Sequence, residues 1–254
     1  MTITSRLPMV QIVIIGTLAG LFAGLFGVGG GFIMVPLFVL WLGMNQKHAH
    51  ATSLLSVSLI SIAALAGYLH LNQVDLNSAA LITLGAIGGI LTGVRLLERF
   101  SERTISIIFA SVLILASTRL LISTEPHQLV HGTAGEILLL VVGFSAGALS
   151  GLLGIGGGIV IVPALIICSG IAPEVARGTS LVVIVITALI GATLHHRLGN
   201  LDHKIAVYSG VAGVPAAALG TYLSSRISSG VLVPMFCLLL IAMAVQLVVR
   251  ARGQ

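Results

Sequence analysis

Long apolar runs alternate with short polar connectors along the chain, and the second half repeats the pattern of the first. In the first half the pattern predicts helices at about 8–26, 32–42, 48–69, 78–97 and 104–121. In the second half it predicts them at about 136–153, 159–169, 174–196, 204–223 and 230–249. Most of these runs approach the roughly 20 residues that a transmembrane helix needs. The pattern therefore predicts an all-α, polytopic membrane protein.

The two halves share a glycine-rich segment in one unbroken register. Residues 24–36 read GLFGVGGGFIMVP, and residues 151–163, placed 127 positions later, read GLLGIGGGIVIVP. The same shift aligns Thr52-Ser53-Leu54 with Thr179-Ser180-Leu181. Internal repeats of this kind are typical of secondary transporters whose site lies between the repeats. We expect one transmembrane domain over residues 1–254, made of a first repeat at about 8–122 and a second at about 136–249.

Each glycine run precedes an apolar element of only 11 residues, at 32–42 and 159–169. Such an element spans about half of a ~30 Å hydrocarbon core. Irregular backbone at membrane depth survives only inside protein or beside water, so we predict a broken or re-entrant helix at each glycine loop. Pro36 and Pro163 are expected to mark the helix breaks. Close packing of helices is the alternative role for the glycines.

The basic residues indicate how the halves are oriented. If each half crosses the membrane an odd number of times, nine of the twelve Lys and Arg residues lie on the side of the N-terminus. If the halves are parallel, the count is six on each side. The positive-inside rule favours the first arrangement, which makes the repeats inverted and both termini cytoplasmic.

Composition and charge narrow the function. Hydrophobic residues make up 57% of the chain and charged residues 7%, so the chain cannot cover a water-soluble surface. The net charge of +5 comes from dispersed residues without interleaved aromatics, which argues against nucleic-acid binding. All seven carboxylates fall in connectors or at helix ends, so a cation site in the membrane has little support. No catalytic, metal-binding or cofactor-binding pattern is found, and we expect none of these roles.

The two glycine loops are the main candidate binding site. Each precedes the N-terminus of a short helix, where backbone amides lack partners and the helix dipole is positive. Glycine leaves these amides uncovered, so two loops that face each other would bind a small oxyanion. The candidate substrate-binding residues are Gly29, Gly30, Gly31, Thr52, Ser53, Gly156, Gly157, Gly158, Thr179 and Ser180. The hydroxyls among them could instead cap helices.

His50 and Arg177 occupy equivalent positions in the two halves, beside the Thr-Ser pairs. Each would place a cationic group near one mouth of the site, since arginine is always charged and histidine titrates near neutral pH. We expect gating or attraction of anions from them more than direct contact with the substrate.

The doubled motif, with Thr-Ser-Leu on the helix that follows each copy, resembles the sulfite exporter TauE/SafE family of membrane permeases. The resemblance extends from about residue 12 to residue 249. It implies transport of small sulfur-containing anions such as sulfite or sulfonates across the bacterial cytoplasmic membrane. It places the family signature on Gly29–Gly31, Pro36, Thr52 and Ser53, and on Gly156–Gly158, Pro163, Thr179 and Ser180.

These observations predict a multi-pass protein of the cytoplasmic membrane that moves a small sulfur-containing anion by alternating access. Its expected partners are the anionic substrate and the lipid bilayer, and a homo-oligomer is compatible with the sequence. Two alternatives stay open: a passive anion channel, and a membrane scaffold subunit that does not transport.

Overall fold

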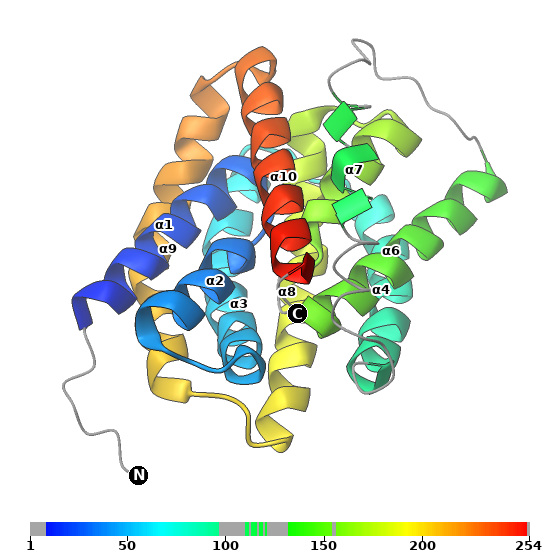
Figure 1. The fold of residues 1–254 in the computed structure, drawn as a ribbon. Helices are drawn as coiled ribbons and strands as arrows, with labels where there is room; N and C mark the ends of the chain where they lie inside the picture. Colours follow the sequence, from blue (N-terminus) through cyan, green and yellow to red (C-terminus); the bar gives the residue numbers. More distant parts are fainter. Residues whose placement is uncertain are drawn as a thin grey trace.

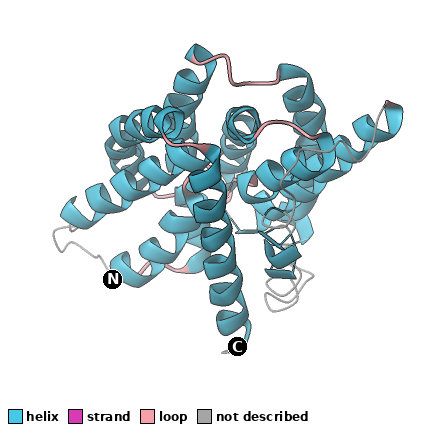
Figure 2. Cartoon of the chain, turned by 90° about the horizontal axis from the view of Figure 1, so that it is seen from above, coloured by secondary structure: helices cyan, strands magenta, loops and turns pink. Residues whose placement is uncertain are grey.

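The computed structural model describes residues 9–96, 110–111, 113–115, 117–118, 120, 132–153 and 156–252. Within these residues the chain forms helices and loops without a strand, which confirms the all-α prediction (Figures 1 and 2). The helices are α1 (Met9–Phe26), α2 (Gly31–Leu42), α3 (Gln46–His70), α4 (Leu76–Leu96), α6 (Thr133–Leu153), α7 (Gly158–Ser169), α8 (Pro173–Arg197), α9 (His203–Arg226) and α10 (Ser229–Arg252). The helix expected at about 104–121 lies largely outside the described residues, and those described within it are helical.

Seven of the described helices are long and apolar enough to cross a membrane, so the chain is a multi-pass membrane protein. The short helices α2 and α7 have 12 residues each, or about 18 Å of length at the α-helical rise. They are therefore too short to cross a ~30 Å hydrocarbon core alone.

The distribution of side chains is that of a protein in lipid. Large apolar side chains such as Leu40 and Leu238, each 73% exposed, lie on the outside. Many hydroxyl groups lie inside, and those of Thr52, Ser56 and Ser61 on α3 are completely buried. A chain folded in water would favour the opposite arrangement, because burial of polar groups is costly and burial of apolar groups is favourable.

Small residues bring α1 into close contact with α9. The backbone of Gly20 lies against the backbone of Gly213, with no room for a Cβ atom on Gly20. Gly16 meets Ser209 before this point, and Gly24 meets Ala217 after it. The contacts follow the same order along both helices, so α1 and α9 are parallel. This close approach is the kind of packing that small residues permit in membranes.

On the other side of the molecule, α4 and α6 pack in the same way (Figure 1). Gly89 of α4 lies against the backbone of Phe144 of α6, and Gly93 lies against Ala148. From α6, Gly147 lies against Ala86. In both pairs, the first helix of one half of the chain packs against the fourth helical element of the other half. The two halves are therefore interlocked rather than packed as separate bodies.

The central helices α3 and α8 run in opposite directions. Leu54, near the start of α3, contacts Gly191 near the end of α8, whereas Tyr68 near the end of α3 contacts Gly178 near the start of α8. The two helices hold the same position in their respective halves. Hydrophobic side chains of α1, α2, α3 and α8 form one buried cluster here, and a second cluster includes residues of α7 and α10.

Candidate functional site

The glycine loops interrupt the chain between a long helix and a short one. Gly30 precedes α2 with a φ of 74°, and Gly157 precedes α7 with a φ of 75°. Residues with side chains rarely adopt this left-handed conformation, so glycine is needed at both positions. No side chain caps either helix. No described residue accepts a hydrogen bond from the amides of Gly29, Gly30 or Gly31.

The two loops meet between α3 and α8. A Cβ atom built on Gly29 would lie 2.9 Å from Cγ2 of Ile184 and 3.1 Å from Cγ1 of Val57. One built on Gly156 would lie 3.2 and 3.4 Å from the same two atoms. Val57 and Ile184 sit near the middle of α3 and α8, which are candidate membrane spans. The N-termini of α2 and α7 thus converge deep inside the helical body.

The first residue of α7 also touches the other loop directly. Gly158 lies against the backbone of Val28 and the carbonyl of Gly27. A side chain at Gly158 would separate the loops, since its Cβ atom would be 2.8 Å from Cα of Val28. The structure therefore brings together Gly29, Gly156 and Gly158 of the predicted site.

The prolines lie inside the short helices and do not end them. Helix α2 continues through Pro36 and α7 continues through Pro163, so the interruption lies at the glycines rather than at the prolines, where a break was expected. Each proline is the sixth residue of a 12-residue helix. It therefore removes one backbone hydrogen bond from the interior of the helix, which continues past it.

The two predicted threonines make equivalent bonds in the two halves. Oγ1 of Thr52 accepts a hydrogen bond from the amide of Asp202 at 3.1 Å, and Oγ1 of Thr179 accepts one from the amide of Asp75 at 2.9 Å. The Asp202 carboxylate caps the start of α9, and that of Asp75 accepts from amides at the start of α4. Each threonine thus fixes a connector of the opposite half. Direct contact between the threonines and a substrate stays a prediction.

Both predicted serines donate to the carbonyl three residues earlier in their own helix, and Ser180 makes this bond to Arg177 at 2.7 Å. Oγ of Ser180 also donates to the carbonyl of Gly27, so α8 is bonded to the first glycine loop. Oγ of Ser53 donates within its own helix to the carbonyl of His50 at 2.8 Å. Ser180 is therefore positioned to move with the loop, and its contact with a substrate also stays a prediction.

Arg177 is buried, with 4% of its surface exposed, although a position at a mouth of the site was expected. Its Nε donates to the carbonyl of Pro173, and Nη1 donates to the carbonyl of Leu25 and to Oγ of Ser224 at 2.9 Å. Nη2 reaches Oγ of Ser229 at 3.5 Å and a carboxylate oxygen of Glu174 at 3.8 Å. The guanidinium therefore joins α8 to the ends of α1 and α9 and the start of α10. His50, at the equivalent position, is half-buried.

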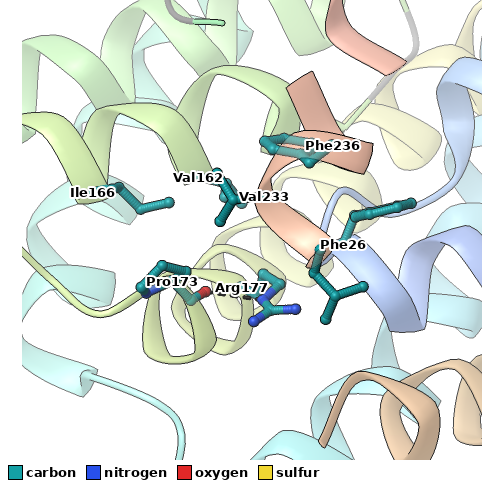
Figure 3. Close-up of a pocket in the computed structure, with 8 residues that line it drawn as sticks. Phe26, Val162, Ile166, Pro173, Arg177, Val233 and Phe236 are labelled. Carbon is teal, nitrogen blue, oxygen red and sulfur yellow. Dashed lines mark hydrogen bonds between the residues drawn. The ribbon is translucent and has the colours of Figure 1, made fainter. Parts of the chain in front are cut away.

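Figure 3 shows a small apolar pocket beside Arg177. The lining residues come from α1, α7, α8 and α10, and they are Phe26, Val162, Ile166, Pro173, Arg177, Leu232, Val233 and Phe236. The rings of Phe26 and Phe236 stack with centroids 5.7 Å apart. Because every nitrogen of the guanidinium already has a partner, the pocket is not itself an anion site in this conformation.

Three groups of this region were not singled out from the sequence. Val57 and Ile184, which cover both loops, align under the same 127-residue shift as the glycines, and that alignment could have identified them. The third is Tyr68, whose hydroxyl donates to the carbonyl of Gly24 at 2.8 Å and lies 2.9 Å from Oγ of Ser224. Its equivalent in the second half is His195, so the repeat gives no hint of it.

Replacing Tyr68 with phenylalanine is expected to lower the free energy of unfolding by about 1 kcal/mol, because a buried hydroxyl with two partners is lost. Thermal unfolding of the purified protein in detergent measures the change. Tyr222→Phe is the matched control, since this side chain is 54% exposed, and we expect no measurable effect there. Equal effects of the two substitutions would contradict the role assigned to Tyr68.

The described residues hold no group of three or more His, Cys, Asp and Glu side chains that could bind a metal. Nε2 of His203 and Nδ1 of His196 lie 3.0 Å apart at the exposed turn between α8 and α9. The two nitrogens are close enough for one hydrogen bond. The two histidines lie at the end of α8 and the start of α9, whereas the glycine loops meet near the middle of α8.

Comparison with known proteins agrees with this architecture. The family model described as sulfite exporter TauE/SafE matches residues 2–120 and 139–254. A probable membrane transporter protein of Xylella fastidiosa (strain 9a5c) is 33% identical over 254 residues, which cover 93% of each chain. The probable membrane transporter protein YunE of Bacillus subtilis is 26% identical, covering 87% of this chain and 89% of its own. A probable membrane transporter protein of Methanocaldococcus jannaschii is 27% identical, and the alignment covers 85% of this chain and 86% of that protein.

These relatives are named as transporters rather than enzymes, and they align with this chain over most of their length. The family match includes both glycine loops and the helices α3 and α8 that enclose them. The chain belongs to the sulfite exporter TauE/SafE family of membrane proteins.

Proposed function

We propose that this protein is a secondary transporter that moves a small sulfur-containing oxyanion across the cytoplasmic membrane. The main support is that two glycine loops meet between the middles of α3 and α8. These loops are Gly27–Gly30 and its counterpart at Gly156–Gly157. Each loop presents the positive end of a 12-residue helix to the same place. The partial positive charges of the two helix ends could stabilise a dianion there without a Lys or Arg side chain in contact with it.

The sulfur chemistry of the substrate is supported by the description of the family, sulfite exporter. Sulfite carries three oxygens that accept hydrogen bonds, and the amides of Gly29, Gly30 and Gly31, which have no acceptor among the described residues, are donors. The site therefore matches an acceptor-rich anion in charge and in hydrogen bonding. Sulfonates present the same arrangement of oxygens at one end.

We further propose that the chain forms a single domain of two inverted repeats that alternate between inward-facing and outward-facing states. The antiparallel packing of α3 and α8 supports inversion, since these helices hold equivalent positions in the two halves. Cytoplasmic termini follow from the distribution of basic residues. Rocking of one bundle against the other around a fixed site is the usual mechanism for such proteins.

Transport is tested with the purified protein in liposomes preloaded with unlabelled sulfite. We expect radiolabelled sulfite to accumulate transiently against its gradient, because a carrier exchanges one substrate molecule for another. Liposomes loaded with chloride at equal ionic strength are the control and should show no such accumulation. Rapid sulfite conductance without counterflow would replace the carrier with a channel. Absence of any sulfite flux would refute the proposed substrate.

The role of the loops is tested by Gly29→Ala, which places a methyl group against Ile184 and Val57, where the loops meet. We expect the affinity for sulfite to fall about tenfold or more, because the methyl group would displace the loop amides from the anion, and the loss of one charge-assisted hydrogen bond is worth roughly that factor. Sulfite-dependent thermal stabilisation measures it.

Gly43→Ala is the matched control for backbone strain. Gly43 ends α2 with a φ of 65°, in the same left-handed region as Gly29, and nothing lies within 4 Å of its Cβ position. Both substitutions should lower the melting temperature, because alanine is strained in this conformation. Only Gly29→Ala should weaken sulfite binding. Equal loss of binding in both variants would show that strain, and not the site, explains the result.

A further inference from the structure

One buried serine beside the glycine loops has no hydrogen-bond partner. Ser61 of α3 is completely buried, and its Oγ forms no hydrogen bond with any described group. The same oxygen lies 3.4 Å from the Cβ position of Gly29. Its hydroxyl is therefore directed at the loop that precedes the N-terminus of α2.

Other serines of the same helix behave differently. Ser53, Ser56 and Ser58 all donate to a carbonyl three or four residues earlier, at 2.8, 3.1 and 2.8 Å. This is the usual arrangement for a serine inside a helix. Buried polar groups are nearly always satisfied, so an unsatisfied one next to a candidate site indicates a ligand that completes it.

The unsatisfied groups around Ser61 are hydrogen-bond donors. The amides of Gly29, Gly30 and Gly31 have no described acceptor, and they lie at the positive end of α2. A hydroxyl can add one more donor to this set. A ligand that satisfies all of them must accept several hydrogen bonds and carry negative charge, which describes an oxyanion.

We infer that Ser61 is a substrate-binding residue whose hydroxyl donates to an oxygen of the anion held at the N-terminus of α2. The inference rests on the proposed function and adds a residue that is absent from the repeated motif. Ser61 is one helical turn beyond Val57, which covers both loops. The hydroxyl and the loop amides therefore approach the anion from the α3 side and from the α2 end.

The second half lacks this hydroxyl. The position equivalent to Ser61 is Ala188, which is also completely buried. At this position the two halves therefore differ, since α3 offers a hydroxyl to the loops and α8 does not. A single anion would bind nearer to α2, rather than on the axis that relates the two loops.

Ser61→Ala tests the inference, with Ser58→Ala as the matched control. Both serines are completely buried in α3, but Ser58 already donates to the carbonyl of Leu55. We expect Ser61→Ala to weaken sulfite binding about tenfold or more, as expected when one hydrogen bond to a charged group is lost. Ser58→Ala should bind as the parent does. The measurements are sulfite titration by thermal shift and equilibrium binding of radiolabelled sulfite, at constant ionic strength with chloride.

Stability without sulfite separates a binding role from a structural one. Removal of an unsatisfied hydroxyl should leave the melting temperature of Ser61→Ala unchanged or raised in chloride alone. The inference would be overturned if Ser61→Ala lowered the melting temperature and reduced sulfite binding only by the fraction of protein that is unfolded. Ser61 would then have a structural role. Sulfite binding equal to that of the parent would also overturn the inference, while the proposed function would stand. If the parent itself binds no sulfite, the proposed function fails and the inference fails with it.

Discussion

Replacing Arg177 with methionine is expected to lower the free energy of unfolding by about 3 kcal/mol, because the substitution leaves several buried acceptors without a donor. The guanidinium bonds the carbonyls of Leu25 and Pro173 and the hydroxyl of Ser224, and it is 4% exposed. Glu174 adds less, since its side chain is 35% exposed and its ion pair at 3.8 Å is screened.

Thermal unfolding and resistance to SDS of the purified variant measure this loss. Arg197→Met is the matched control, because Arg197 is exposed at the end of the same helix. We expect it to unfold as the parent does. An Arg177→Met variant as stable as the parent, but deficient in sulfite binding, would make Arg177 an anion-attracting residue as the sequence suggested.

A single methyl group at Gly20 is expected to lower the free energy of unfolding by about 3 kcal/mol. Its Cβ atom would collide with the backbone of Gly213, and backbone cannot rotate away as a side chain can. The helices α1 and α9 would have to separate along the contact that joins the two halves of the chain. Size-exclusion chromatography and thermal unfolding of Gly20→Ala measure the consequence.

Gly88→Ala is the control for this substitution. Gly88 also lies within a transmembrane helix, but the nearest atom to its Cβ position is Cδ2 of Phe144, at the ordinary distance of 3.6 Å. There we expect a neutral or slightly stabilising effect, since alanine favours the helix over glycine. If both variants are equally stable, the close approach of α1 and α9 is not what holds the halves together.

The helices themselves could be predicted because the bilayer leaves few alternatives. The element expected at 159–169 is α7 at Gly158–Ser169, and the one expected at 174–196 is α8 at Pro173–Arg197. In lipid every backbone amide needs an internal partner, so a long apolar run becomes a helix that ends where polar residues begin. Glycine runs mark where the helix cannot continue without help from the rest of the protein.

The contacts between halves were harder to predict. The repeat indicated that two loops would be related, but not that Gly29 and Gly156 would rest on the same pair of side chains. That depends on how α3 and α8 cross, which no local pattern encodes. The same holds for Arg177, which was expected at a mouth of the site and instead lies 4% exposed among groups from α1, α9 and α10.

Departures from the repeat were the least predictable. Tyr68 and His195 occupy equivalent positions, as do Ser61 and Ala188, yet their hydrogen-bonding capacities differ. A motif search finds what the halves share and passes over such differences. Whether a hydroxyl is satisfied depends on neighbours from other helices, and so it becomes visible only in three dimensions.

The pairing of α1 with α9 has a consequence for biosynthesis. Helix α1 is made before α2, and its partner α9 emerges from the ribosome only after α8 has been made. Until then the strip of small residues at Gly16, Gly20 and Gly24 is without the surface on which it packs. The nascent chain therefore cannot complete the packing of its first half until α9 has been made.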